Sequence, residues 1–159
     1  MAMLDVGSEA PEFSLQDQAG NKVSLRALRG NWVVLYFYPR DDTPGCTREA
    51  CNFRDNHADL TGAGAVVLGL SPDRQSTHAK FAQKYELPFQ LLVDGENHET
   101  ARAYGAWGLK KNYGKEYEGM IRSTVVIDPE GRVAKTWGKV KPDQHGAEVL
   151  AWIRAQAER

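Results

Sequence analysis

Cysteine is scarce in this chain, which has only Cys46 and Cys51 among its 159 residues. Two cysteines are too few for the disulfide framework of a small secreted scaffold, and in a reducing compartment they suit redox or catalytic duty. The chain also lacks a basic segment leading into an apolar run at its start, and no window approaches the length of a membrane span. We therefore expect a cytoplasmic protein with no membrane partner.

Strong charge of either sign is absent as well. The formal net charge is −1, so nucleic acid is not an expected partner. No glycine-rich phosphate loop follows an apolar run, and we predict no cofactor. Cys46, Cys51 and His57 are a conceivable set of zinc ligands. Their spacing is unlike that of common zinc sites and a fourth ligand is missing nearby, so we predict no metal.

The chain does have an ordinary share of hydrophobic residues, 42%, which together with its length suits one domain over residues 1–159. Apolar runs of strand length alternate with helix-start signals, a pattern typical of parallel βαβ units with helices on both faces of a sheet. We expect Thr43, Ser71 and Asp94 to cap helices. The predicted elements are a hairpin (13–15 and 23–25), strands (32–38, 65–70 and 90–93), helices (43–60, 71 to before 87, 94–105 and 142 onward) and a second hairpin (121–127 and 132–137).

Residues 106–119 interrupt this alternation with aromatic residues among glycines and lysines. We predict a long loop here. It is a wall beside the reactive cysteine, a docking surface for a reductant, or a surface loop held down by its aromatic side chains, and we favour the last interpretation. The cluster of Lys110, Lys111 and Lys115 is typical of a solvated surface.

The central feature is the stretch 39–51, which joins the most apolar run to a predicted helix and contains both cysteines. Thr43 and Pro44 form a helix-start signal, with a hydroxyl at the cap and a proline at the first helical position. Cys46 then falls in the first turn, beside unpaired N–H groups and the positive end of the helix dipole, which both favour the thiolate. On position alone, a small buried hydrophobe is the alternative.

Cys51 lies five residues after Cys46, a spacing that a regular helix cannot bridge with a disulfide. At about 1.5 Å rise and 100° per residue, the two Cα atoms would lie roughly 8 to 9 Å apart on different faces, beyond the roughly 7 Å limit. A disulfide therefore requires the first turns to unwind, and so short a loop makes a poor structural staple. What remains is a disulfide that forms transiently, with Cys46 as attacker and Cys51 as resolver.

Pro39, Thr43 and Cys46, in the pattern P-x-x-x-T-x-x-C, resemble the peroxidatic-cysteine motif of the peroxiredoxins. Cys51, five positions later, resembles the arrangement in the bacterioferritin comigratory protein (PrxQ-type) branch. The similarity extends from residues 7–13 to the last helix. The resemblance implies a single α/β domain with a thioredoxin-like sandwich, in which helices flank a central mixed β-sheet, and with an N-terminal β-hairpin extension.

The resemblance also implies a thiol-dependent peroxidase with a role in antioxidant defence. The Cys46 thiolate would attack hydrogen peroxide or an organic hydroperoxide and become a sulfenic acid. Cys51 would then form an intramolecular disulfide with it, which a thioredoxin-like or glutaredoxin-like reductant recycles. A monomer or a weak dimer is the expected assembly.

Four further residues match family positions near the reacting sulfur. Arg122 matches the arginine placed against that sulfur, although the strand pattern alone favours a solvent-facing arginine. Thr43 would stabilise the leaving oxygen, or simply cap the helix. Pro39 would shield the thiolate from water, or simply end the strand. Glu49, one turn beyond Cys46, would orient Arg122, or lie on the surface.

Two other functions stay open at this point. A general thiol-disulfide oxidoreductase normally has a C-x-x-C pair after its first strand, and this chain has none. A redox-sensing holdase would use the two cysteines only to sense oxidation.

Overall fold

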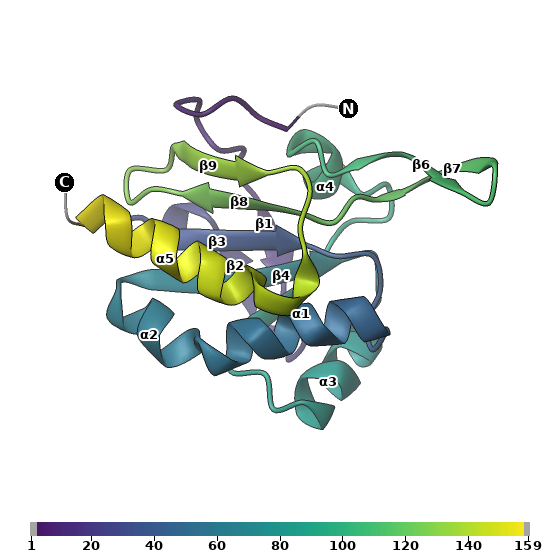
Figure 1. Cartoon of the computed structure of the whole chain (residues 1–159), viewed down its shortest axis with the longest axis horizontal. Helices are drawn as coiled ribbons and strands as arrows, with labels where there is room; N and C mark the ends of the chain where they lie inside the picture. Colours follow the sequence, from purple (N-terminus) through teal and green to yellow (C-terminus); the bar gives the residue numbers. More distant parts are fainter. Residues whose placement is uncertain (1–2, 158–159) are drawn as a thin grey trace.

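The computed structural model describes residues 3–157, which form a central sheet with helices on both faces (Figure 1). The strands of this sheet follow the order β2-β1-β5-β4-β3-β8-β9. Within the described range no helix is both long and apolar enough to cross a bilayer. The strands are β1 (Ser14–Gln16), β2 (Lys22–Ser24), β3 (Trp32–Phe37), β4 (Ala65–Ser71), β5 (Gln90–Val93), β8 (Ser123–Ile127) and β9 (Val133–Trp137). The helices are α1 (Pro44–Asp55), α2 (His57–Gly62), α3 (Gln75–Lys84), α4 (Glu99–Ala103) and α5 (His145–Ala157), with short 3-10 turns η1 (Arg26–Leu28) and η2 (Pro142–Gln144).

The sheet is mixed, because its middle strands are parallel and its outer strands are not. β3 pairs in parallel with β4, and β4 pairs in parallel with β5. β8 lies antiparallel against the other side of β3, and β9 lies antiparallel against β8. At the opposite edge β1 is antiparallel to both β5 and β2. The predicted mixed sheet, the parallel crossovers and the N-terminal hairpin are thus confirmed.

β3 is buried on both faces, which explains why its sequence is one continuous apolar run. Val34 and Tyr36 point into a core that also contains side chains of α1, α3 and α5. Val33 and Leu35 point the other way, into a core shared with α4 and the N-terminal segment. Helices therefore cover both faces as predicted, and the end of β3 leads the chain directly toward α1.

The helix predicted over residues 43–60 is in fact two helices. α1 ends at Asp55 and α2 begins at His57, with Asn56 between them. The Asn56 amide donates to the Asn52 carbonyl oxygen at 2.8 Å, a local side-chain bond that competes with a continuous helix. The prediction of one helix is wrong at this residue.

The next two helices begin later than predicted. Ser71 closes β4 and does not cap α3, because its hydroxyl donates to Asp73 at 2.7 Å and α3 begins only at Gln75. α4 is shorter than the predicted helix, but the Asp94 carboxylate accepts two N–H bonds from its first turn, at 3.1 and 3.0 Å. Asp94 thus caps this helix from outside it.

The loop predicted over residues 106–119 is wrong. β6 (Trp107–Asn112) and β7 (Lys115–Met120) form an antiparallel hairpin that projects beyond the main sheet (Figure 1). Its two-residue turn has positive φ at Tyr113 and Gly114, 53° and 78°, which is the backbone twist that suits a tight hairpin. The first four residues of β7 are exposed and carry little apolar alternation, so the sequence pattern did not mark the hairpin.

α5 packs so closely on α1 that a glycine at the contact has no room for a side chain. A Cβ added at Gly146 would lie 2.8 Å from backbone atoms of Asn52 and Phe53. We expect Gly146→Ala to lower the free energy of unfolding by about 1–3 kcal/mol, because backbone atoms cannot move aside as a flexible side chain does. Urea unfolding measures the loss.

Gly62→Ala is the matched control for this substitution. Its Cβ would meet nothing within 4 Å, and alanine is favoured over glycine in a helix by roughly 0.5–1 kcal/mol. Equal losses in the two proteins would show that the α1–α5 contact is not the cause.

Candidate active site

Cys46 lies in the first turn of α1 with its side chain turned into the core. It is 1% exposed and packs in the cluster between α1 and the sheet. The helix begins at Pro44, and its first internal bond runs from the Thr47 N–H to the Thr43 carbonyl oxygen at 2.8 Å. The sulfur is therefore close to the positive end of the helix dipole. The predicted first-turn, inward-facing position is confirmed.

The guanidinium of Arg122 joins Cys46 to Glu49. Its Nη2 donates to Cys46 Sγ at 3.1 Å, and its Nη1 donates to Glu49 Oε1 at 2.7 Å. Arg122 precedes β8 and does not lie within it, so the argument from strand faces does not apply. The Glu49 side chain is fully buried, which excludes the alternative of a surface glutamate. Three of the predicted site residues form one hydrogen-bonded unit.

Burial sets the electrostatics of this unit. It raises the pKa of Glu49 from 4.5 to about 7, against the opposing effect of the Arg122 charge. Burial also works against the charge of Arg122, but Glu49 and Cys46 outweigh it, and the pKa of Arg122 is raised. Arg122 thus keeps its charge near neutral pH, where Glu49 titrates. The second Glu49 oxygen, Oε2, has no hydrogen-bond partner among the described residues.

Lys110 of the projecting hairpin bonds to the backbone just before Arg122. Its Nζ donates to the Met120 carbonyl oxygen at 2.8 Å, two residues before Arg122. Burial lowers the pKa of Lys110, and Arg122 lowers it further, while Cys46 acts in the opposite direction. The charge of Lys110 therefore acts on the same site. The interpretation of a solvated surface is wrong for Lys110, because this side chain is half-buried in the hairpin.

Thr43 and Pro39 lie in the link between β3 and α1. Thr43 occupies the N-cap position as predicted, but its hydroxyl donates to the Arg40 carbonyl oxygen at 2.9 Å and makes no cap bond to the helix. Hydroxyl capping by Thr43 is therefore wrong. Pro39 is half-buried and follows directly after the fully buried Tyr38.

Cys51 lies in the same helix as Cys46. Both thiols are free, and Cys51 is partly exposed where Cys46 is buried. A regular helix carries side chains five residues apart on different faces. The intact α1 therefore keeps the two sulfurs from bonding, as the spacing predicts.

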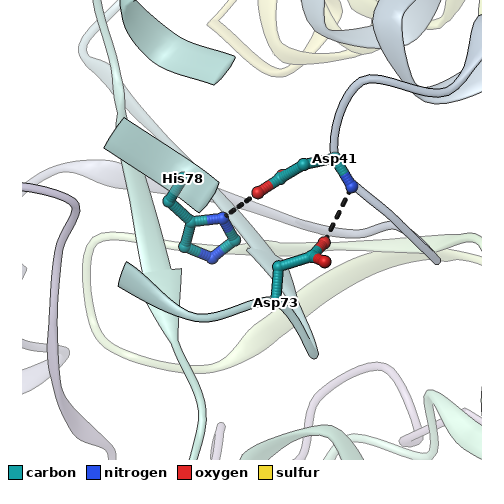
Figure 2. Close-up of side chains that lie close together, drawn as sticks. All are labelled: Asp41, Asp73 and His78. Atoms are coloured by element: carbon teal, nitrogen blue, oxygen red, sulfur yellow. Dashed lines mark hydrogen bonds and ion pairs between the residues drawn. The ribbon is translucent and has the colours of Figure 1, made fainter. Parts of the chain in front are cut away.

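One further cluster of titratable side chains lies beside the site. Asp41, Asp73 and His78 place one ligand atom each within 4.8 Å of the others, and they are the one group of this kind among the described residues (Figure 2). The two cysteines and His57 do not form such a group. Sequence reasoning missed the cluster because its members come from separate segments and form no short motif.

The sequence model of the AhpC/TSA family matches residues 6–136. The chain belongs to this family. Peroxiredoxin Bcp of Bacillus subtilis is 49% identical over 156 residues, which cover 98% of this chain and 99% of that protein. Peroxiredoxin Bcp of Escherichia coli K12 is 41% identical over 157 residues, which cover 99% and 100%. A solved structure of Xanthomonas campestris bacterioferritin comigratory protein, studied for its alkyl peroxide reduction activity, has a TM-score of 0.89 and 38% identity, and the match covers 96% of this chain and 99% of that one.

These matches confirm the resemblance inferred from the cysteine motif. The chain is a peroxiredoxin with the thioredoxin-type fold, and its activity is the thiol-dependent reduction of peroxides. A peroxide as substrate and a thiol as reductant follow from membership of this class.

The raised pKa of Glu49 makes the stability of the fold depend on pH. Between the ordinary value of 4.5 and about 7, the folded chain binds more protons at this group than the unfolded chain does. Wild-type stability therefore falls as the pH rises through this window. We expect Glu49→Gln to remove that decline, which is at most about 3 kcal/mol.

Urea unfolding at a series of pH values across the window measures this decline. Glu130→Gln, at an exposed position, is the matched control and should keep the wild-type pH dependence. A constant difference between wild type and Glu49→Gln at every pH would show that Glu49 does not titrate there.

Proposed function

We propose that Cys46 is the peroxidatic residue and that Arg122 holds its thiolate ready to react. The observation that carries this proposal is the 3.1 Å contact between Arg122 Nη2 and Cys46 Sγ. A charge-assisted hydrogen bond is roughly twice as strong as a neutral one, so the guanidinium favours an anionic sulfur over a thiol. The positive end of α1 acts in the same direction.

The proposed reaction is a nucleophilic displacement at the O–O bond. An electron pair of the Cys46 thiolate forms an S–O bond to the terminal peroxide oxygen. The O–O bond breaks, and its electron pair leaves with the other oxygen, which takes a proton and becomes water or an alcohol. Cys46 is oxidised to a sulfenic acid while the peroxide is reduced. Because negative charge moves to the leaving oxygen, donors already in place stabilise the transition state.

Arg122 and the first turn of α1 are placed to supply these donors. The N–H groups of Gly45 and Cys46 come before Thr47, whose N–H makes the first internal bond of the helix. Gly45 also leaves space for the guanidinium, since a Cβ there would lie 3.1 Å from Arg122 Nη2. The helix start and the arginine therefore approach the sulfur together.

Three further residues complete the proposed site. Glu49 orients Arg122 through the 2.7 Å bond between Oε1 and Nη1. Thr43 uses its hydroxyl proton on the Arg40 carbonyl oxygen, so its own oxygen stays available to accept the O–H of an incoming peroxide. Pro39, which has no N–H and is half-buried, shields the thiolate from water.

Cys51 is the proposed resolving residue. Its thiolate attacks the sulfenic sulfur of Cys46 and forms the S–S bond. The S–O bond breaks, and the hydroxyl group leaves with the electron pair and takes a proton to become water. The first turns of α1 must open for the two sulfurs to meet. The partial exposure of Cys51 agrees with a thiol that moves into place.

The reaction also needs a peroxide substrate and a reductant that restores the two thiols. Hydrogen peroxide and organic hydroperoxides are the proposed substrates, and the alkyl peroxide reduction studied in the Xanthomonas campestris relative supports the organic class. A thioredoxin-like or glutaredoxin-like protein is the proposed reductant. We place the protein in the cytoplasm, where thiols are kept reduced, as a monomer or weak dimer.

Replacing each cysteine separates the two proposed roles. We expect Cys46→Ser to abolish peroxide consumption, because no other thiol is held by Arg122. Cys51→Ser should consume about one equivalent and then stop with Cys46 as the sulfenic acid. Mass spectrometry after one equivalent of peroxide measures both outcomes. An unmodified Cys46 in the reduced Cys51→Ser protein would refute the assignment, and the Cys46→Ser protein controls for oxidation elsewhere.

A further inference from the structure

Asp41 is the centre of a buried hydrogen-bond network in the active-site loop, which we define as residues 38–43 (Figure 2). Its Oδ1 accepts from the Tyr38 hydroxyl at 2.6 Å, and its Oδ2 lies 2.6 Å from His78 Nδ1. Its backbone N–H donates to Asp73 Oδ2 at 2.7 Å. Asp41 is only 5% exposed and His78 is fully buried. Asp41 thus bonds to Tyr38 within the loop and connects the loop to α3 and to the segment after β4.

The His78 ring extends this connection into the sheet. Its Nδ1 meets the Asp41 carboxylate, and its Nε2 lies 2.8 Å from the Leu92 carbonyl oxygen in β5. Since the ring is rigid and bonded at both nitrogens, it fixes the distance between the loop and a central strand. A bond in a buried site is also stronger than the same bond in water.

The backbone conformation of Asp42, the next residue, shows that the loop must be held in place by its surroundings. Asp42 has a φ of 55°, a left-handed conformation that is strained for a non-glycine residue and persists only where its surroundings hold it. On the outer side, its carboxylate accepts from Lys84 Nζ and from the Tyr85 hydroxyl, both at 2.8 Å. These bonds are exposed, and exposed ion pairs contribute little. The buried Asp41 network therefore carries most of the constraint.

We propose that Asp41 and His78 are positioning residues, which hold the active-site loop through the bond between Oδ2 and Nδ1 so that Pro39 and Thr43 stay in place beside Cys46. This rests on the proposed function, because the loop matters for rate only if Cys46 is the reacting group. Because Asp41 lies upstream of α1, its bonds need not break when the helix opens. Pro39 and Thr43 then stay in place while the disulfide forms.

A bound cation would be another use of the same side chains, but their contacts favour a network. Asp73 Oδ2 accepts from both the Asp41 N–H and the Ser71 hydroxyl, at 2.7 Å each. Side chains that satisfy one another in this way need no ion. Elemental analysis of the purified protein separates the two uses. A stoichiometric metal ion that is lost in His78→Asn would overturn the proposal.

Two amide substitutions at His78 distinguish positioning from general support of the fold. The amide nitrogen of asparagine lies as many bonds from the backbone as Nδ1 does, so His78→Asn keeps the donor to Asp41. The amide nitrogen of glutamine matches Nε2, so His78→Gln keeps the contact with Leu92. Each variant loses one of the two bonds. If His78 only supports the fold, the two substitutions should therefore lower the rate constant to a similar extent.

We expect His78→Gln to lower the rate constant for the reaction of reduced protein with hydrogen peroxide at least about fivefold more than His78→Asn does. Stopped-flow tryptophan fluorescence measures the rate, and urea unfolding measures the stability of both variants. A ratio below about fivefold, or a slower His78→Asn protein, would overturn the proposal.

If His78→Gln does not fold, Asp41→Asn tests the same proposal. Its amide donates to Nδ1 and its oxygen still accepts from Tyr38, so the loop stays connected. A folded Asp41→Asn protein should lose less than about fivefold in rate constant, and a larger loss would overturn the proposal.

Asp42→Asn is the matched control, since it alters only the exposed bonds of the same loop. Its rate constant should stay within about twofold of wild type, and a loss as large as that of His78→Gln would overturn the proposal. Failure of the proposed function gives a different result. If the proposed function is wrong, Cys46 of the wild-type protein stays unoxidised. If the wild-type protein reacts but the two His78 variants react at equal rates, only the positioning role is contradicted.

Discussion

The guanidinium of Arg122 is the group on which the geometry of the site depends. It donates to Cys46 Sγ and to Glu49 Oε1 at the same time, at 3.1 and 2.7 Å. A planar fork of fixed donors can do this, whereas the ammonium of lysine is a single point of charge on a flexible stem. Arg122 comes from the link into β8, and the other two residues come from one turn of α1. The three side chains can therefore meet only if the distance between the start of β8 and α1 is kept.

The proposed chemistry also requires the sulfur to leave this contact, and bonds to the rest of the fold lie on both sides of the part of the helix that must open. Upstream, Asp41 connects the active-site loop to α3 and the sheet. Downstream, the Ala147 N–H donates to Asn52 Oδ1 at 3.0 Å, beside the close contact at Gly146. Both cysteines lie between these two points. Opening can then be confined to the start of α1, so the core around β3 need not be disturbed.

Local patterns in the sequence predicted the elements whose cause is local. β3 is recognisable because consecutive apolar side chains are buried on both faces, and the start of α1 follows from Thr43 and Pro44. The hairpin of β6 and β7 was missed because most of β7 is exposed and needs no apolar alternation. The same limit applies to the site. The contact between Arg122 and Cys46 spans 76 residues, so only the family resemblance suggested it. The Asp41–His78 pair, 37 residues apart, had no signal of either kind.

If Arg122 keeps Cys46 as a thiolate, the ultraviolet absorbance of the thiolate must depend on this arginine. The measurement uses reduced Cys51→Ser protein near neutral pH, with and without the further substitution Arg122→Met, so that Cys46 is the only thiol observed. Methionine keeps an unbranched apolar stem but removes the charge and both donors. We expect a clear thiolate band in the protein with Arg122 and a much weaker band in the protein with methionine. Equal bands in two folded proteins, or a protonated thiol in both, would contradict it.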